Sequence, residues 1–203
     1  MQFAQPEPRC QTCALTLQRG STGILRCGAC ITSPPALDSC LTAVSYTYPW
    51  SGLVGRFKFN SSPGLAAEFA RVMRSTPWVE PALESADLVL PMPLSKRRLR
   101  QRGYNQALLL ARALDTNKLK SSILLRIKDT PAQSLLDRAQ RLRAVADAFA
   151  VDPLLAAQLR GRRVVLVDDV MTSGSTLNAA ARTLRAAGAS HVTGLVFART
   201  ENE

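Results

Sequence analysis

The clearest hydrophobic pattern in this chain is an unbroken apolar run at residues 164–167, which two acidic residues follow. Mostly β-branched apolar residues without alternation are typical of a strand covered on both faces, as in a parallel sheet packed between helices. After a short polar segment, apolar residues recur from Leu177 to Leu184 at the spacing of one helix face, and Gly188 is placed to end that helix. This order predicts a buried strand, a tight loop and an amphipathic helix.

Other parts of the chain also alternate between strand and helix patterns. The predicted strands cover residues 43–48, 88–92, 123–127, 164–167 and 192–198, and two further predicted helices cover residues 65–73 and a segment after Tyr104. This alternation predicts an α/β fold with a mainly parallel sheet flanked by helices. Ligands of such sheets bind at the carboxyl ends of the strands.

Asp168 and Asp169 stand at such a strand end. Two adjacent carboxylates repel each other unless they meet donors, such as sugar hydroxyls, or a cation such as Mg²⁺. Segment 172–176 has small hydroxyl residues and a flexible glycine, so its backbone N–H groups can close around a phosphate at the positive end of the next helix. The stretch indicates a ribose-phosphate site, although an ordinary capped strand-to-helix turn has a similar composition.

The same residues resemble the phosphoribosyl diphosphate (PRPP) signature of the type I phosphoribosyltransferases. The resemblance implies that Asp168 and Asp169 are catalytic residues that hold the ribose hydroxyls, and that the loop binds the 5′-phosphate. The loop residues are Thr172, Ser173, Gly174, Ser175 and Thr176. Ser173 stands where a second Thr is common in that family, and this exchange keeps the hydroxyl group.

Two Cys-x-x-Cys pairs lie near the start of the chain: Cys10, Cys13, Cys27 and Cys30. Pairs at this separation can place four thiolates around one Zn²⁺, and four cysteines close its coordination shell, so we expect a structural zinc. A disulfide pair in a secreted protein is the alternative, but residues 1–8 lack the basic start and apolar run of a signal peptide. Cys40 is left over and fits a small buried residue better than a ligand.

Five of the seven residues from Lys96 to Arg102 are basic. We expect a basic loop at the carboxyl edge of strand 88–92, where Lys96, Arg97, Arg100 and Arg102 could bind a diphosphate. A solvated helix start is the alternative. The Cys pairs, Pro-x-Pro-Leu at residues 91–94, the basic segment, Arg-Gly-Tyr-Asn-Gln at residues 102–106 and the PRPP signature occur in this order. Over nearly its whole length the chain thus resembles the ComF family of competence-associated, phosphoribosyltransferase-like proteins.

The ComF resemblance implies a phosphoribosyltransferase-like domain with a zinc-ribbon-like module. It favours a phosphoribosyltransferase, a glycosyltransferase of unknown acceptor that binds PRPP with Mg²⁺, and a role in the uptake of single-stranded DNA during natural transformation. A DNA-uptake helicase is a candidate partner. The alternative is a non-catalytic single-stranded DNA-binding accessory protein that uses the site only as a phosphate cradle.

The polar and basic segment 126–143 is expected to form a mobile flap that covers the reacting centre and excludes water. Its second half could instead be an amphipathic helix of the core. The ComF family usually places Asn near Ala144, before the pair Ala148 and Phe149. The replacement of this Asn weakens the case for full catalytic competence.

Five aromatic residues lie in or after the first predicted strand: Tyr46, Tyr48, Trp50, Phe57 and Phe59. They could stack on nucleic-acid bases, although aromatic residues so close to a strand more often belong to the core. Lys58 lies among them and could reach a phosphate.

Composition adds limits to this picture. The 203 residues, 46% of them apolar, suffice for one core and a small appendage. We expect a zinc module at residues 1–40 and a phosphoribosyltransferase-like domain at 41–203, with a strand and helix lead-in or hood at 41–86 and the α/β core at 87–203. The formal net charge of +11 favours phosphate-bearing partners. With no long apolar run, we expect no membrane insertion and a cytoplasmic location.

Overall fold

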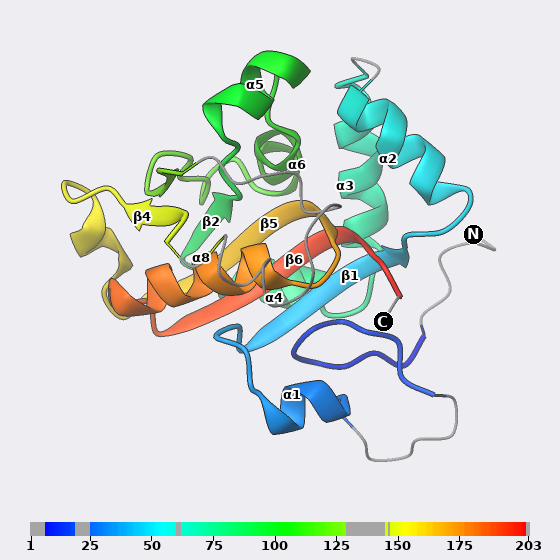
Figure 1. Cartoon of the computed structure of the whole chain (residues 1–203), viewed down its shortest axis with the longest axis horizontal. Helices are drawn as coiled ribbons and strands as arrows, with labels where there is room; N and C mark the ends of the chain where they lie inside the picture. Colours follow the sequence, from blue (N-terminus) through cyan, green and yellow to red (C-terminus); the bar gives the residue numbers. More distant parts are fainter. Residues whose placement is uncertain (1–6, 19–24, 60–61, 129–144, 146, 202–203) are drawn as a thin grey trace.

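A four-stranded parallel sheet forms the centre of the molecule (Figure 1). The computed structural model describes residues 7–18, 25–59, 62–128, 145 and 147–201. The strands of the sheet, in the spatial order β1-β6-β5-β2, are β1 (Ser39–Ser45), β6 (His191–Arg199), β5 (Arg163–Met171) and β2 (Leu88–Pro91). All three strand pairs are parallel, which confirms the predicted α/β class.

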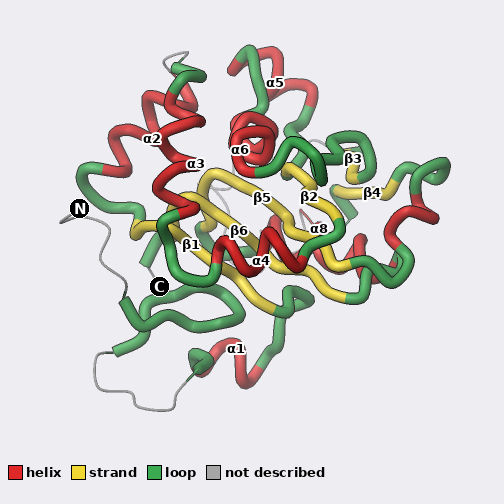
Figure 2. Tube along the Cα trace, turned by 180° about the vertical axis from the view of Figure 1, so that it is seen from behind, coloured by secondary structure: helices red, strands yellow, loops and turns green. Residues whose placement is uncertain are grey.

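Helices cover both faces of this sheet (Figures 1 and 2). The helices of the described residues are α1 (Gly28–Thr32), α2 (Trp50–Phe59), α3 (Leu65–Arg74), α4 (Val79–Ser85), α5 (Lys96–Arg102), α6 (Gln106–Leu114) and α8 (Ser175–Ala186), with a 3₁₀ turn, η2 (Ala156–Leu159), and of these α1 and α5 lie away from the sheet faces. Buried side chains of α8 pack on one face, whereas those of α2, α3, α4 and α6 pack on the other. The site described below lies where these two layers meet at the strand ends.

Strand β5 is central because both of its faces are apolar. Val164 and Leu166 belong to the core under α8, and Val165 and Val167 belong to the core under the other helices. Each of these four side chains is at most 2% exposed. In a continuous apolar run, alternate side chains pack into the core on each face of the sheet, as the sequence pattern predicts.

Helix α8 confirms the predicted amphipathic pattern after the loop. Leu177, Ala180, Ala181 and Leu184 are all buried against the sheet. Gly188 follows with a φ of 100°, a left-handed conformation in which glycine is least strained, and the chain then turns into β6.

Strand β5 continues past the predicted end at residue 167 to Met171, so Asp168 and Asp169 lie inside the strand near its carboxyl end. Three other predicted elements also differ from the structure. The first strand covers Ser39–Ser45 rather than 43–48, because its pairing with β6 begins and ends there. Residues Leu124–Arg126 form β3, which pairs antiparallel with β4 (Phe149–Val151) and lies outside the parallel sheet. The segment Lys96–Arg102 is helix α5 rather than a loop, because the Ser95 hydroxyl accepts a hydrogen bond from the Arg98 N–H and caps its first turn.

The segment with the Cys pairs is attached to the edge of the sheet formed by β1 and to the end of β6. The Cys40 N–H donates to the Gln11 carbonyl at 2.8 Å, and Arg199 Nε donates to the Cys13 carbonyl at 3.0 Å. Arg9 adds an ion pair with Glu201, 2.8 Å between Nη1 and Oε1. Whether residues 1–40 are a separate domain stays a prediction.

Within the described ranges, every helix falls short of the length and apolar character needed to cross a bilayer.

Candidate functional site

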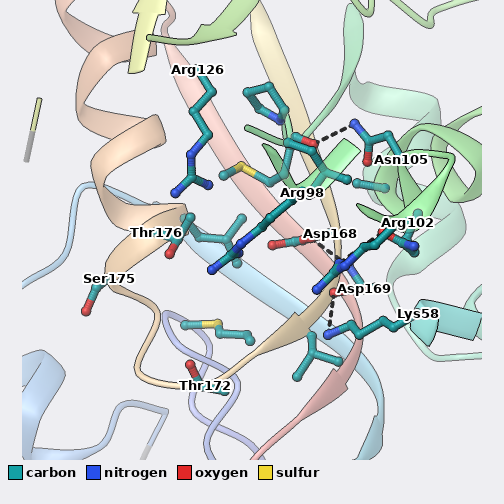
Figure 3. A pocket seen from close by; sticks show the side chains of 18 of the residues that line it. Lys58, Arg98, Arg102, Asn105, Arg126, Asp168, Asp169, Thr172, Ser175 and Thr176 are labelled. Carbon is teal, nitrogen blue, oxygen red and sulfur yellow. Dashed lines mark hydrogen bonds and ion pairs between the residues drawn. The ribbon is translucent and has the colours of Figure 1, made fainter. Parts of the chain in front are cut away.

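A polar pocket opens at the carboxyl ends of β5 and β2, where the notable sequence motifs meet (Figure 3). Residues from α2, α5, α6, β3, β5 and the start of α8 line it. Its charged side chains are Lys58, Arg98, Arg102, Arg126, Asp168 and Asp169. Four cationic groups therefore face two carboxylates in one cavity, an arrangement suited to an anionic ligand that also carries hydroxyl groups.

The two carboxylates of the pocket have different partners. Asp169 forms an ion pair with Lys58, with 3.1 Å between Oδ1 and Nζ. Asp168 Oδ1 accepts a hydrogen bond from the backbone N–H of Asp169 at 2.9 Å. Burial, followed by repulsion from Asp169, raises the pKa of Asp168 from 3.8 to about 7. Asp168 is thus near its titration point at neutral pH, whereas Asp169 is engaged by a lysine.

The predicted phosphate loop joins β5 to α8. Gly174 has a φ of 75°, a left-handed conformation that favours glycine, whereas the Met171 Cε methyl, 2.3 Å from the position of a Cβ, is the end of a flexible side chain that can move aside. The Ser173 and Ser175 hydroxyls lie 2.8 Å apart, and Ser173 Oγ also accepts the Ser175 N–H at 3.4 Å. Thr172, Gly174, Ser175 and Thr176 line the pocket, and Ser173 is exposed beside it. The first turn of α8 holds no acidic residue, so its positive end favours an anion.

Helix α5 divides its basic residues between the pocket and solvent. Arg98 and Arg102 line the pocket, whereas Lys96, Arg97 and Arg100 are exposed. Burial, and then repulsion from Arg102 and Arg97, lowers the pKa of Arg98. Of the four cations predicted for a diphosphate, the structure brings only Arg102 into the pocket. Arg98 joins it because helical geometry, rather than a loop, determines which side chains face inward.

The Arg-Gly-Tyr-Asn-Gln motif builds the corner between α5 and α6. Gly103 ends α5 with a φ of 80°. Asn105 caps α6 by accepting the Leu108 N–H at 3.4 Å, and its Nδ2 donates to the Met92 carbonyl at 3.0 Å, which ties the corner to the end of β2. The corner thereby directs Arg102 into the pocket.

Tyr104 and Gln106 of the same motif also contribute to the site. The Tyr104 hydroxyl donates to the Phe57 carbonyl on α2, next to Lys58. Gln106 is 1% exposed, and its Oε1 accepts from Arg102 Nη1 at 3.1 Å. Both residues therefore hold cations of the pocket in place.

Aromatic rings support two of the arginines. The Arg102 guanidinium lies 5.3 Å from the centre of the Phe59 ring, and that of Arg126 lies 5.5 Å from Phe149. Phe57 is fully buried and packs edge-on against Phe69 of α3, as expected for a core residue. The aromatic group therefore does not form one continuous stacking surface.

Sequence reasoning did not include Arg98, Arg126 or the ion pair of Lys58 among the site residues. Lys58 precedes the acid pair by more than a hundred positions, and only the packing of α2 beside β5 brings them together. The signal available for Lys58 was a lone lysine in an aromatic segment. Most of the expected flap, residues 129–144 with Ala144, lies outside the described residues, so its predicted role stays a prediction.

A second cluster of reactive side chains lies in the N-terminal segment. The sulfur atoms of Cys10, Cys13, Cys27 and Cys30 all lie within 4.8 Å of one another, close enough to hold one metal ion such as zinc. Burial alone would raise the pKa of the Cys10 thiol, but the backbone N–H groups around it outweigh burial and lower its pKa to about 7. The donor set of four sulfurs fits Zn²⁺.

Cys40 does not belong to this cluster. It is 3% exposed in β1, and its Sγ lies 3.6 Å from Met171 Sδ. Burial raises its pKa to about 12, so it stays a neutral thiol in the core.

Comparison with known proteins agrees with these features. The family model of the phosphoribosyl transferase domain matches residues 107–202. The chain is 34% identical over 194 residues to competence protein F of Haemophilus influenzae, an alignment covering 91% of this chain and 82% of the relative. The chain belongs to the ComF family. A DNA utilization protein, YhgH of Escherichia coli K12, is 30% identical over 187 residues, covering 87% and 78% of the two chains.

Other relatives of this ComF-family protein match less of their length. Competence protein ComFC of Bacillus subtilis is 32% identical over 131 residues, covering 64% of this chain and 51% of the relative. Among solved structures, the glutamine PRPP amidotransferase of B. subtilis superposes with a TM-score of 0.41 and 20% identity, covering 70% of this chain and 30% of that enzyme.

Proposed function

We propose that this ComF-family protein binds PRPP, or a closely related ribose 5-phosphate, in the pocket between β5, α5 and α8. It transfers the phosphoribosyl group to an acceptor that no residue of the pocket identifies. The observation that carries this proposal is the meeting of four cations, two carboxylates and a helix N-terminus in one cavity. A ligand with phosphates at both ends of a sugar matches this distribution of charge.

Each part of the pocket then has a role. The loop 172–176 and the start of α8 bind the 5′-phosphate, and the acid pair accepts hydrogen bonds from the ribose hydroxyls. Arg98 and Arg102 bind the diphosphate and stabilise its charge as the bond between the anomeric carbon and the diphosphate oxygen breaks. The lone pair of the acceptor forms the new bond to that carbon, and diphosphate leaves with the electrons of the broken bond.

Mg²⁺, expected with PRPP, does not fit this pocket as a resident ion. One carboxylate already holds Lys58, and Arg98 and Arg102 line the same cavity. A divalent cation would meet net repulsion there unless phosphate groups accompany it. We therefore assign Mg²⁺, where it takes part, to the diphosphate of the ligand, and derive no step through it.

Calorimetry with PRPP tests the binding site. The Asp168→Asn and Asp169→Asn double variant should lose PRPP binding and keep its fold by circular dichroism, whereas the exposed control Glu68→Gln should bind as the wild type does. Unchanged affinity in the double variant would refute the assignment. Catalysis needs a further experiment, in which diphosphate release is measured across a panel of nitrogen bases.

A second function is favoured by the outer side of α5. Lys96, Arg97 and Arg100 are exposed, and none of them forms a salt bridge with a described carboxylate. Exposed cations on one helix suit the phosphates of single-stranded DNA, and the relatives are named for competence and DNA utilization. We infer a role in handling incoming DNA during natural transformation, with a DNA-uptake helicase as a candidate partner.

DNA binding and PRPP binding are separable by mutation. Replacing Lys96, Arg97 and Arg100 by Gln should weaken single-stranded DNA binding and reduce its salt dependence, while PRPP affinity stays unchanged. A protein that binds DNA equally well without these charges would contradict the role of α5.

The remaining expectations belong to the same proposal. Residues 1–40 form a module around a structural Zn²⁺ held by the four clustered cysteines. We place the protein in the cytoplasm, where thiols stay reduced and both PRPP and incoming DNA are found.

A further inference from the structure

The ion pair between Lys58 and Asp169 is the most buried salt bridge between described residues. Lys58 Nζ lies 3.1 Å from Asp169 Oδ1, and the two side chains are only 17% and 10% exposed (Figure 3). A pair so shielded from water interacts more strongly than one on the surface, and removing either partner leaves the other poorly solvated. Lys58 is thus a partly buried residue of the pocket rather than a surface lysine.

The helix that carries Lys58 is held firmly at this end. Phe57 is fully buried, and its ring packs against Phe69 and Tyr104. The Tyr104 hydroxyl donates to the Phe57 carbonyl, one residue before the lysine. The backbone of α2 therefore fixes the origin of the Lys58 side chain, and the ammonium group reaches the acid pair from a preset position.

The charges around the acid pair determine what it can bind. Arg98 and Arg102 line the same cavity as Lys58, so three of its four cationic groups, besides Arg126, share the pocket with Asp168 and Asp169 even before a ligand arrives. A free divalent cation would have to displace Lys58 from Asp169 and then lie among these groups. An anionic sugar phosphate would instead be attracted by all three.

We propose that Lys58 is the resident cation of the acid pair. It excludes free divalent cations from the unliganded pocket, and it allows a ribose 5-phosphate to bind without one. The second half of this proposal rests on the proposed function, because it requires that a ribose 5-phosphate is a ligand. The first half concerns only the free protein.

Mn²⁺ binding to the zinc-loaded, ligand-free protein tests the first half, because electron paramagnetic resonance counts free and bound Mn²⁺ directly. Wild type and the control Arg56→Met, which removes an exposed cation from the same helix, should bind no Mn²⁺ at the acid pair. Lys58→Met should acquire one Mn²⁺, and adding Asp168→Asn and Asp169→Asn to that variant should remove it. Lys58→Arg keeps the charge and should exclude Mn²⁺ as wild type does.

Two results would overturn this half. One is wild-type Mn²⁺ binding that Asp169→Asn abolishes, and the other is a folded Lys58→Met variant that acquires no Mn²⁺. If Lys58→Met fails to fold, Tyr104→Phe serves instead, because it keeps the lysine and loosens its support. That variant should bind Mn²⁺ at the acid pair, where wild type binds none, and a folded Tyr104→Phe protein that also binds none would overturn the proposal.

Calorimetry with ribose 5-phosphate, in buffer with and without Mg²⁺, tests the second half. Wild-type affinity should change by less than about threefold on adding Mg²⁺, whereas Lys58→Met should lose about tenfold without Mg²⁺ and regain most of it when Mg²⁺ is added. A wild type that binds ribose 5-phosphate only with Mg²⁺ would refute this half. If ribose 5-phosphate binds to no variant, the proposed function fails together with the second half, and the Mn²⁺ result still decides the first.

Discussion

The replacement Asp168→Asn should stabilise the free protein at alkaline pH, although it removes a group of the proposed site. Asp168 has its pKa raised from 3.8 to about 7 by burial and by the neighbouring Asp169. An acid with a raised pKa binds its proton more tightly in the folded state, so its ionisation opposes folding as pH rises between these two values. Asparagine has nearly the same shape and never ionises, and its Oδ1 can still accept the Asp169 N–H.

The structure gives the size of this effect. One pKa unit corresponds to about 1.4 kcal/mol, and the interval from about pH 5 to the raised pKa covers about two units, so the upper limit is about 3 kcal/mol. Asp168 is partly exposed, and solvent reduces the penalty. We expect the stability of Asp168→Asn relative to wild type to increase by about 1 to 3 kcal/mol between about pH 5 and about pH 8.

Urea denaturation at the two pH values measures this difference. Asp87→Asn is the matched control, because the backbone N–H of Arg163 and the Arg162 side chain lower the pKa of Asp87. Its replacement should destabilise the protein to a similar extent at about pH 5 and about pH 8, because both values lie above the range in which Asp87 titrates. If Asp168→Asn is no more stable than wild type at about pH 8, or if its effect does not change with pH, then burial and Asp169 do not raise the pKa of Asp168.

Three further predictions concern other parts of the site. Gly174→Ala should destabilise the protein by about 1 to 2 kcal/mol in urea and abolish phosphate binding, because an alanine is strained at this positive φ; equal stability would contradict the loop geometry. Arg102→Gln should weaken PRPP binding by about 10- to 100-fold in calorimetry, whereas the exposed Arg112→Gln should not, and equal losses would show a nonspecific charge effect. Metal analysis should find one zinc per chain, and Cys13→Ser should lower the zinc content and the melting temperature; a zinc-free wild type of unchanged melting temperature would exclude a structural metal.

Local patterns were sufficient for the central elements of the fold. The apolar run 164–167, the helix face from Leu177 to Leu184 and the terminating Gly188 all lie where they were predicted. Each pattern states how many faces of an element are buried, and this depends on neighbours in the sequence alone. The sulfur cluster was predictable for the same reason, since two Cys-x-x-Cys pairs place their thiols locally.

Pairing and packing between distant segments were less accessible. Residues Leu124–Arg126 have a strand pattern, but the pattern could not show that their partner is β4 rather than the main sheet. The density of basic residues in segment 96–102 favours a loop, and the pattern does not show that Ser95 caps a helix there. Helix geometry then decided that Arg98 and Arg102 face the pocket and that Arg97 faces solvent.

The sequence by itself determined the α/β class, the acid pair near the carboxyl end of a buried strand, the glycine loop before a helix and the four clustered cysteines. Only the tertiary structure decided that Lys58 of α2 meets Asp169. The packing of α2 and α6 against the sheet holds the two side chains next to each other. Motifs arise from neighbours along the chain, whereas the charge balance of a pocket depends on which distant side chains the core brings together.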